Sequence, residues 1–327
     1  MKSKSSYLVK PHTHVRLSRF STSEHPGIED KEAADATLAQ FRGRLAGLQE
    51  VLYAGQQKAV LIVLQGMDTA GKDGTIANIF SGINPQGCNV ASFKVPTVLE
   101  ARHDFLWRCH AEVPPRGMIG IFNRSHYEDV LWPRVHGSMG AKEMRRHIAD
   151  INEWEAMLAD NGVLILKFFL HICRDEQTRR LQSRLETPNK HWKLSPADFA
   201  ERKFWPQYMS TYEEILSSSS SKQAPWFVIP SDHKWYRDVA ISHALVNAMK
   251  GLKLKYPAPT FDPAGIHLDG KISKPSGKKR RSSEKNQRNR SRGGPVRQTS
   301  GGGKLCETCP QLSFLEARIQ EATGAPL

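Results

Sequence analysis

The chain has 327 residues, of which 39% are hydrophobic and 24% charged, and its formal net charge is +14. Its longest apolar runs, 59–64 and 163–170, are far shorter than the ~20 residues that a membrane-spanning helix needs, and its amino terminus lacks the apolar core of a secretory signal. We therefore expect a cytoplasmic protein with no membrane partner.

A helix is the first element that the sequence predicts, after an N-terminal extension over 1–28. Apolar residues recur at helical spacing from Glu29 to Tyr53. The run KAVLIVLQG, 58–66, is continuously apolar and ends in glycine, which is typical of a parallel strand buried on both faces.

Strands and helices then alternate along the chain. Further strands are predicted at 90–93, 118–122, 163–170 and 226–229, and further helices at 72–83, 99–110, 141–159, 175–186, 196–216 and 234–251. Such alternation predicts an α/β protein with three layers, in which helices cover both faces of a parallel sheet. Ligands in these folds bind at the carboxyl ends of the strands.

The loop after the first strand has the spacing of a phosphate-binding loop. In GMDTAGKDG, Gly66 is followed after four residues by Gly71 and Lys72, and Gly74 comes two residues later. Between a strand and a helix, backbone amides face a phosphate, glycines allow the tight turn, and the lysine reaches the outer phosphates. A glycine-rich turn can be purely structural, but this context favours phosphate binding.

Two acidic residues in this loop depart from the usual pattern. Asp73 stands where serine or threonine normally binds magnesium, and Asp68 lies inside the loop. Carboxylates beside a phosphate are tolerable if a cation lies between them, so the two acids predict magnesium held by carboxylates. The alternative is that either residue caps the following helix.

The strand at 118–122 leads into a second group of polar residues. Asn123 is followed directly by Arg124, and Glu128 comes four residues after Arg124. An arginine at a strand end beside a phosphate loop can bind a phosphoryl group through two nitrogens, and Glu128 could hold a metal ion or orient the acceptor oxygen. Taken alone, the stretch would be an ordinary junction between strand and loop.

Basic residues crowd the helix after the fourth strand and the loop beyond it. They are Arg179, Arg180, Arg184, Lys190 and Lys193. In nucleotide kinases, an arginine-rich segment closes over the phosphates and neutralises the charge that develops during transfer. We predict such a lid over about 175–215, with a solvated charged helix face as the alternative.

The sequence changes character after Tyr256. Residues 271–304 hold twelve Lys and Arg against one acidic residue, which predicts a disordered basic segment over 257–304. This segment could solubilise the protein, concentrate an anionic substrate or bind nucleic acid nonspecifically.

Residues 305–327 are weakly amphipathic. Cys306 and Cys309 have metal-ligand spacing, but zinc needs four ligands and no second pair lies nearby, so we predict no zinc site.

Together these segments resemble the polyphosphate kinase 2 family. Its phosphate loop, GxDxxGKDG, is matched by residues 66–74, and FNRSHYEDV, 122–130, looks like its second motif. The segments ASFKVPT, DEQTRRLQSRL and APWFVIPSDHKWYR fall in the family's order and spacing. The likeness covers about 29–256 and leaves out the basic tail.

The resemblance implies a P-loop three-layer α/β/α domain with a helical lid, similar to that of thymidylate kinases. It implies reversible, Mg²⁺-dependent phosphoryl transfer from inorganic polyphosphate to a nucleotide, in a homo-oligomer. Members with NRSHYEDV resemble the subgroup acting on nucleoside mono- and diphosphates, so AMP, ADP and ATP are the expected nucleotides. Asn123 replaces the aspartate of the commoner motif, which leaves the preferred acceptor open.

The resemblance also assigns roles to residues. Those implied as catalytic are Asp68, Lys72, Asp73, Arg124 and Glu128, with the metal on Asp68 and Glu128. Those implied to bind phosphate or nucleotide are Gly66, Gly71, Lys72, Gly74, Asn123, Arg124, Arg180 and Arg184, the last two from the lid.

Two other functions are possible. An ATP-dependent nucleoside monophosphate kinase shares the fold, but Asp73 in place of serine or threonine argues against it. A nucleic-acid-binding protein with a vestigial phosphate site would leave the acids and arginines without a purpose, and the basic segment lacks stacking aromatic residues.

Overall fold

The computed structural model describes residues 7–261. The predictions for the basic segment beyond Phe261, for 305–327 and for Cys306 and Cys309 lie outside the described residues.

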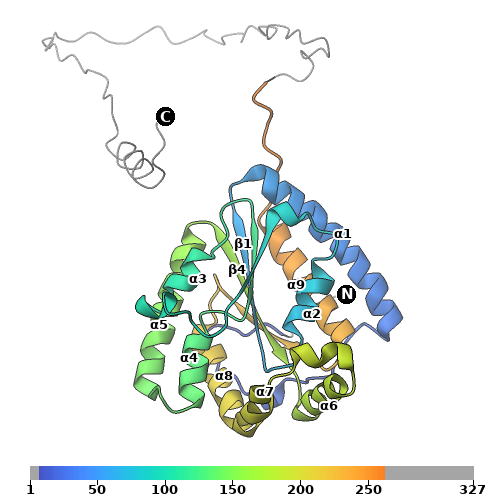
Figure 1. Cartoon of the computed structure of the whole chain (residues 1–327). Helices are drawn as coiled ribbons and strands as arrows, with labels where there is room; N and C mark the ends of the chain where they lie inside the picture. Colours follow the sequence, from blue (N-terminus) through green and yellow to red (C-terminus); the bar gives the residue numbers. More distant parts are fainter. Residues whose placement is uncertain (1–6, 262–327) are drawn as a thin grey trace, which may run out of the picture. The chain divides into compact units, whose positions relative to one another are not determined.

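A five-stranded sheet, parallel throughout, forms the middle of the domain (Figure 1). Its strands are β1 (Ala59–Gln65), β2 (Cys88–Ser92), β3 (Ile119–Asn123), β4 (Val163–His171) and β5 (Trp226–Pro230). They lie in the order β2-β3-β1-β4-β5. The central strand β1 is buried along its whole length, as its continuous apolar run predicts. The predicted parallel sheet is therefore confirmed.

Helices cover both faces of the sheet, which confirms the three-layer α/β arrangement (Figure 1). The helices are α1 (Lys31–Gly55), α2 (Lys72–Ile79), α3 (Trp107–Ala111), α4 (Glu128–Val135), α5 (Ala141–Asp160), α6 (Arg174–Leu185), α7 (Pro196–Glu201), α8 (Trp205–Ser219) and α9 (Lys234–Gly251). α1, α2 and α9 lie on one face, and α3, α4, α5 and α8 on the other. Within 7–261, no helix is long and apolar enough to cross a membrane.

The helix predicted over 99–110 is wrong in its extent. The structure has a short 3₁₀ turn at Glu100–Arg102 and then α3, with an extended residue, His103, between them. The Asp104 carboxylate accepts a hydrogen bond from the Leu106 amide at 3.0 Å. This local bond competes with helical pairing and separates the two pieces.

Two further differences involve prolines. The helix predicted from about Pro196 is broken into α7 and α8 by a 3₁₀ turn at Arg202–Phe204, and Pro206 lies in the first turn of α8. Proline has no amide to donate to the preceding turn, so a new helix begins there. The sequence pattern predicts no helix at α4, which continues through Pro133.

Residues 7–28, the described part of the N-terminal extension, pack against the rest of the domain. Leu8 forms an antiparallel bridge with Phe227 of β5, and the Val9 amide donates to the Trp226 carbonyl at 2.9 Å. Val9, Val15 and Leu17 belong to the main hydrophobic core. The segment therefore covers the edge of β5 and contributes apolar side chains to the domain.

The burial of Leu17, which is 2% exposed, predicts that Leu17→Ala lowers the free energy of unfolding. Removing a buried leucine side chain costs about 2–5 kcal/mol. Chemical denaturation followed by circular dichroism measures the change. Leu99→Ala is the matched control, because Leu99 is 58% exposed and its loss costs about 0.5 kcal/mol or less. Equal stability of the two variants would mean that the N-terminal segment is not part of the core.

Candidate active site

The phosphate-binding loop lies between β1 and α2, as its sequence context predicts. Gly66 has φ +153°, and a Cβ added there would lie 2.8 Å from the Leu170 carbonyl oxygen. Gly71 has φ +105°, and its Cβ would lie 2.1 Å from Nη1 of Arg237. Both positions therefore require glycine, for backbone conformation and for space.

Lys72 begins α2 and its side chain points back into the loop. It is 9% exposed, and its Nζ donates to the Gly66 carbonyl at 2.8 Å. Burial and the positive charge of Arg124 lower the pKa of Lys72, while Asp68 and Glu128 act in the opposite direction. The ammonium group is thus held inside the loop, close to both carboxylates.

Arg124 links the phosphate loop to the end of β3. Its backbone is left-handed, with φ +64°. Its Nη2 lies 2.8 Å from Asp68 Oδ1, and its Nη1 lies 3.9 Å from Glu128 Oε2. Next to it, the side-chain amide nitrogen (Nδ2) of Asn123 donates to Asp73 Oδ1 at 2.7 Å. The structure therefore brings together the two groups of residues that the sequence analysis singled out.

Gln65, the last residue of β1, contacts the carboxylate oxygen of Glu128 that Arg124 does not contact. With its amide oriented to match the surrounding donors and acceptors, Gln65 donates to Glu128 Oε1 at 2.9 Å and accepts from the Ser125 amide at 3.2 Å. Burial raises the pKa of Glu128, although Arg124 and Lys72 oppose this.

The donor set of Asp68 and Glu128 is chemically suited to Mg²⁺, which prefers carboxylate oxygens. In residues 7–261, no cluster of three or more His, Cys, Asp or Glu side chains is arranged to hold a metal ion. Arg124 contacts both carboxylates instead. A guanidinium group thus supplies the positive charge between the two acids.

A pocket of about 840 Å³ opens from the loop toward α6 and the segment beyond it. Its walls include basic side chains from five parts of the chain: Lys72, Lys94, Arg124, Arg179, Arg180, Arg184, Lys190, Lys193, Lys234 and Arg237. Clustered Lys and Arg side chains are suited to an extended anion with several phosphates. The basic residues predicted for a lid do line this pocket.

Arg180 is placed differently from a lid residue that contacts phosphates, which is the role that the family resemblance implies. It is 5% exposed and pairs with Glu176. Its Nη1 donates to the carbonyls of Thr69 and Ala70, both at 2.9 Å, and its Nη2 donates to the carbonyls of Ser231 and Asp232 at 2.6 and 3.0 Å. Arg180 therefore holds the phosphate loop against the end of β5.

Arg237 is a loop contact that the sequence analysis did not single out. It is 1% exposed, pairs with Asp238, and donates to the Ala70 carbonyl at 3.3 Å. The segment APWFVIPSDHKWYR, which contributes to the family resemblance, contains this residue, but no local pattern gives it a role. Arg184 is more open and lies 3.9 Å from Asp198 in α7.

The chain is similar in sequence to proteins of one known family. The sequence model of polyphosphate kinase 2 matches residues 28–257. The AMP/ADP-polyphosphate phosphotransferase of Meiothermus ruber is 48% identical over 254 residues, which cover 77% of this chain and 95% of that protein. The ADP-polyphosphate phosphotransferase of Rhodopseudomonas palustris is 43% identical over 258 residues, covering 75% of this chain and 89% of that one.

A solved structure agrees with this similarity. The crystal structure of polyphosphate kinase 2 from Arthrobacter aurescens TC1 matches with a TM-score of 0.75 and 42% sequence identity, covering 79% of this chain and 95% of that chain. The chain belongs to the polyphosphate kinase 2 family.

Proposed function

We propose that the chain catalyses reversible, Mg²⁺-dependent transfer of the terminal phosphoryl group of inorganic polyphosphate to AMP and ADP. The observation that carries the proposal is the convergence of the loop lysine, Asp68 and Arg124 in a pocket lined with basic residues. Glu128 lines a second, smaller pocket, which Asp68 and Arg124 also line. The relative from M. ruber is named for AMP and ADP, and that from R. palustris for ADP. AMP as an acceptor is therefore the finer part of the proposal.

Polyphosphate suits this pocket because its negative charge is spread along a chain. The basic side chains extend from Lys94 after β2 to Lys190 and Lys193 beyond α6. A donor with many phosphates can contact such a surface at several points, whereas the triphosphate of ATP would reach fewer of them. The charge distribution supports polyphosphate over ATP as the donor.

Phosphoryl transfer requires positioning and charge neutralisation more than covalent chemistry. Lys72 lies where its ammonium group can leave the Gly66 carbonyl for a phosphoryl oxygen. Arg124 can bind phosphoryl oxygens through two nitrogens. Gly66, Gly71 and Gly74 allow close backbone approach, Asn123 holds Asp73, and Arg184 faces the pocket from the lid.

We assign Mg²⁺ to Asp68 and Glu128, with Asp73 close by. When bound, the ion supplies positive charge between the phosphates and the carboxylates. The carboxylates already accept a cation, because Arg124 contacts both of them. A cytoplasmic location, a homo-oligomeric state and a catalytic domain over 29–256 with its lid at 175–215 stay predictions.

We expect purified full-length protein to form ADP from AMP, and ATP from ADP, with polyphosphate as the sole phosphoryl donor. Product formation is measured by chromatography of the nucleotides. Activity with ATP as donor and none with polyphosphate would make the chain an ATP-dependent nucleoside monophosphate kinase. Product from ADP alone would restrict the acceptor to diphosphates.

Replacing the loop lysine tests the site itself. We expect Lys72→Ala to lower kcat by roughly 10² or more, the scale of losing one preorganised charge contact in the transition state. Lys142→Ala is the control, because Lys142 is an exposed lysine on α5, outside the pocket. Steady-state rates with saturating polyphosphate and AMP measure the difference. Near-native turnover of Lys72→Ala would contradict the assignment of the loop.

Neutral substitutions test the metal site. We expect Asp68→Asn and Glu128→Gln each to raise the Mg²⁺ concentration needed for half-maximal rate by about tenfold or more, because each removes a charged oxygen ligand. Glu143→Gln, an exposed change on α5, is the control. An unchanged Mg²⁺ dependence in both site variants would remove these two residues from the metal site.

A further inference from the structure

The loop between β3 and α4 contains three consecutive side chains that are closed to solvent. Ser125, His126 and Tyr127 are each 0% exposed. On either side of them, Arg124 lines the pocket of basic residues, and Glu128 lines the smaller second pocket of the site. Arg124 also has a left-handed backbone, which a non-glycine residue keeps only where its surroundings hold it there. The core beneath the loop must therefore fix its conformation.

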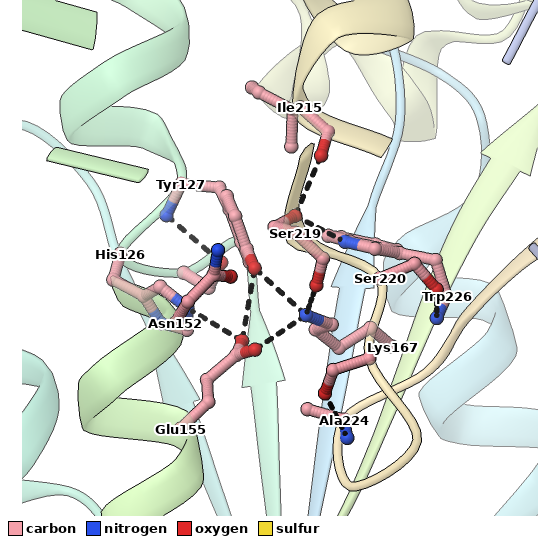
Figure 2. Close-up of polar contacts among 12 residues, drawn as sticks. His126, Tyr127, Asn152, Glu155, Lys167, Ile215, Ser219, Ser220, Ala224 and Trp226 are labelled. Atoms are coloured by element: carbon pink, nitrogen blue, oxygen red, sulfur yellow. Dashed lines mark hydrogen bonds and ion pairs between the residues drawn. The ribbon is translucent and has the colours of Figure 1, made fainter. Parts of the chain in front are cut away.

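A buried ion pair lies at this point (Figure 2). Glu155 comes from α5 and Lys167 from β4, and they are 2% and 0% exposed. Lys167 Nζ lies 2.5 Å from Glu155 Oε2, and it also donates to the Tyr127 hydroxyl at 2.9 Å and to the Ser219 carbonyl at 2.7 Å. All three donors of the ammonium group have partners.

Two ring side chains join this pair to the loop (Figure 2). The Tyr127 hydroxyl donates to Glu155 Oε1 at 3.0 Å, and His126 Nε2 lies 3.3 Å from the same oxygen. The carboxylate oxygen can only accept, so Nε2 of His126 is the donor in this contact. Burial acts to raise the pKa of Glu155, but Lys167 and His126 lower it overall, so the carboxylate is ionised.

Stability alone does not account for the ion pair. Taking two charges out of water costs about as much as their attraction returns, and apolar replacements of similar volume are often as stable. Neither Glu155 nor Lys167 lines the pockets of the site. What the pair does provide is a set of directional bonds to two residues adjacent to the site.

We infer that Glu155 and Lys167 are positioning residues for phosphoryl transfer: by fixing His126 and Tyr127 they hold Arg124 and Glu128 in place for the reaction. The inference rests on the proposed function. A loop that loses these bonds keeps its catalytic groups but holds them less accurately, and misplacement of about 1 Å can cost 10²-fold in rate.

Tyr127→Phe is the first variant, because it removes only the hydroxyl that joins the loop to the ion pair and keeps the ring. We expect kcat to fall about tenfold or more, with the KM values for AMP and polyphosphate changed less than about threefold. Ser220→Ala is the matched control. Its buried hydroxyl donates to the Val9 carbonyl at 2.7 Å and accepts from the Trp226 amide at 3.1 Å, without touching the loop.

Thermal unfolding distinguishes a loss of kcat caused by misplaced catalytic residues from one caused by destabilisation of the whole domain. We expect both variants to keep a Tm within about 5 °C of the wild type, with the loss of kcat confined to Tyr127→Phe. A second variant, Glu155→Gln combined with Lys167→Met, removes both charges together and leaves neither one unpaired. It is expected to show the same loss of kcat. A native kcat in Tyr127→Phe and in the Glu155→Gln, Lys167→Met double variant would overturn the inference.

A double-mutant comparison tests whether the effect passes through Arg124. In an Arg124→Ala background, where one of the two positioned groups is absent, Tyr127→Phe is expected to lower kcat less than it does in the wild type. An undiminished tenfold loss in that background would show that the network does not act through Arg124 and would contradict its place in the inference.

The wild-type assay distinguishes failure of the proposed function from failure of this inference. If the wild type used ATP rather than polyphosphate as donor, the proposed function would be wrong, and the same comparison of variants would be made with ATP. A loss of kcat in Tyr127→Phe and in the Glu155→Gln, Lys167→Met double variant, but not in Ser220→Ala, would then still support positioning. Unchanged kcat values in those two variants would contradict the inference.

Discussion

The parallel pairing of β1 with β3 is the constraint on which the site depends. Leu64 lies opposite Asn123, and the Arg124 amide donates to the Leu64 carbonyl at 3.1 Å, so the two strands end at the same level. For this reason Asp68 and Arg124, which are 56 residues apart, form an ion pair of 2.8 Å. A register shift of one residue would turn Asn123 to the other face of the sheet and separate these groups.

The sequence predicts the parts of the site whose signals are local. An apolar strand followed by the glycine and lysine spacing locates Lys72, and a strand end followed by polar residues locates Arg124 and Glu128. Arg180 and Arg237 bind backbone carbonyls more than 100 residues away, and a helical pattern says only that such residues lie on a charged face. The packing of Leu17 into the core could not be predicted for the same reason.

The charge on Lys72 links substrate binding to the chemistry. Burial and Arg124 lower the pKa of this lysine, because both disfavour a second positive charge in a confined loop. A phosphate bound beside it acts in the opposite sense and favours the ammonium form. Since the ammonium form is the one that neutralises charge during transfer, binding of an anionic donor strengthens the protonation state that the reaction uses.

The arginines of α6 limit how a lid could move. Arg180 is tied to four carbonyls of the phosphate loop and the end of β5, so rotating the whole helix as a rigid body would break all four bonds at once. Arg184, one turn later, has only a 3.3 Å bond to the Lys193 carbonyl and a distant contact with Asp198. A closure over the pocket would therefore have to bend the chain after Arg180. The first half of α6 would then stay with the phosphate loop, and the predicted lid would be confined to the end of α6 and the segment that follows it.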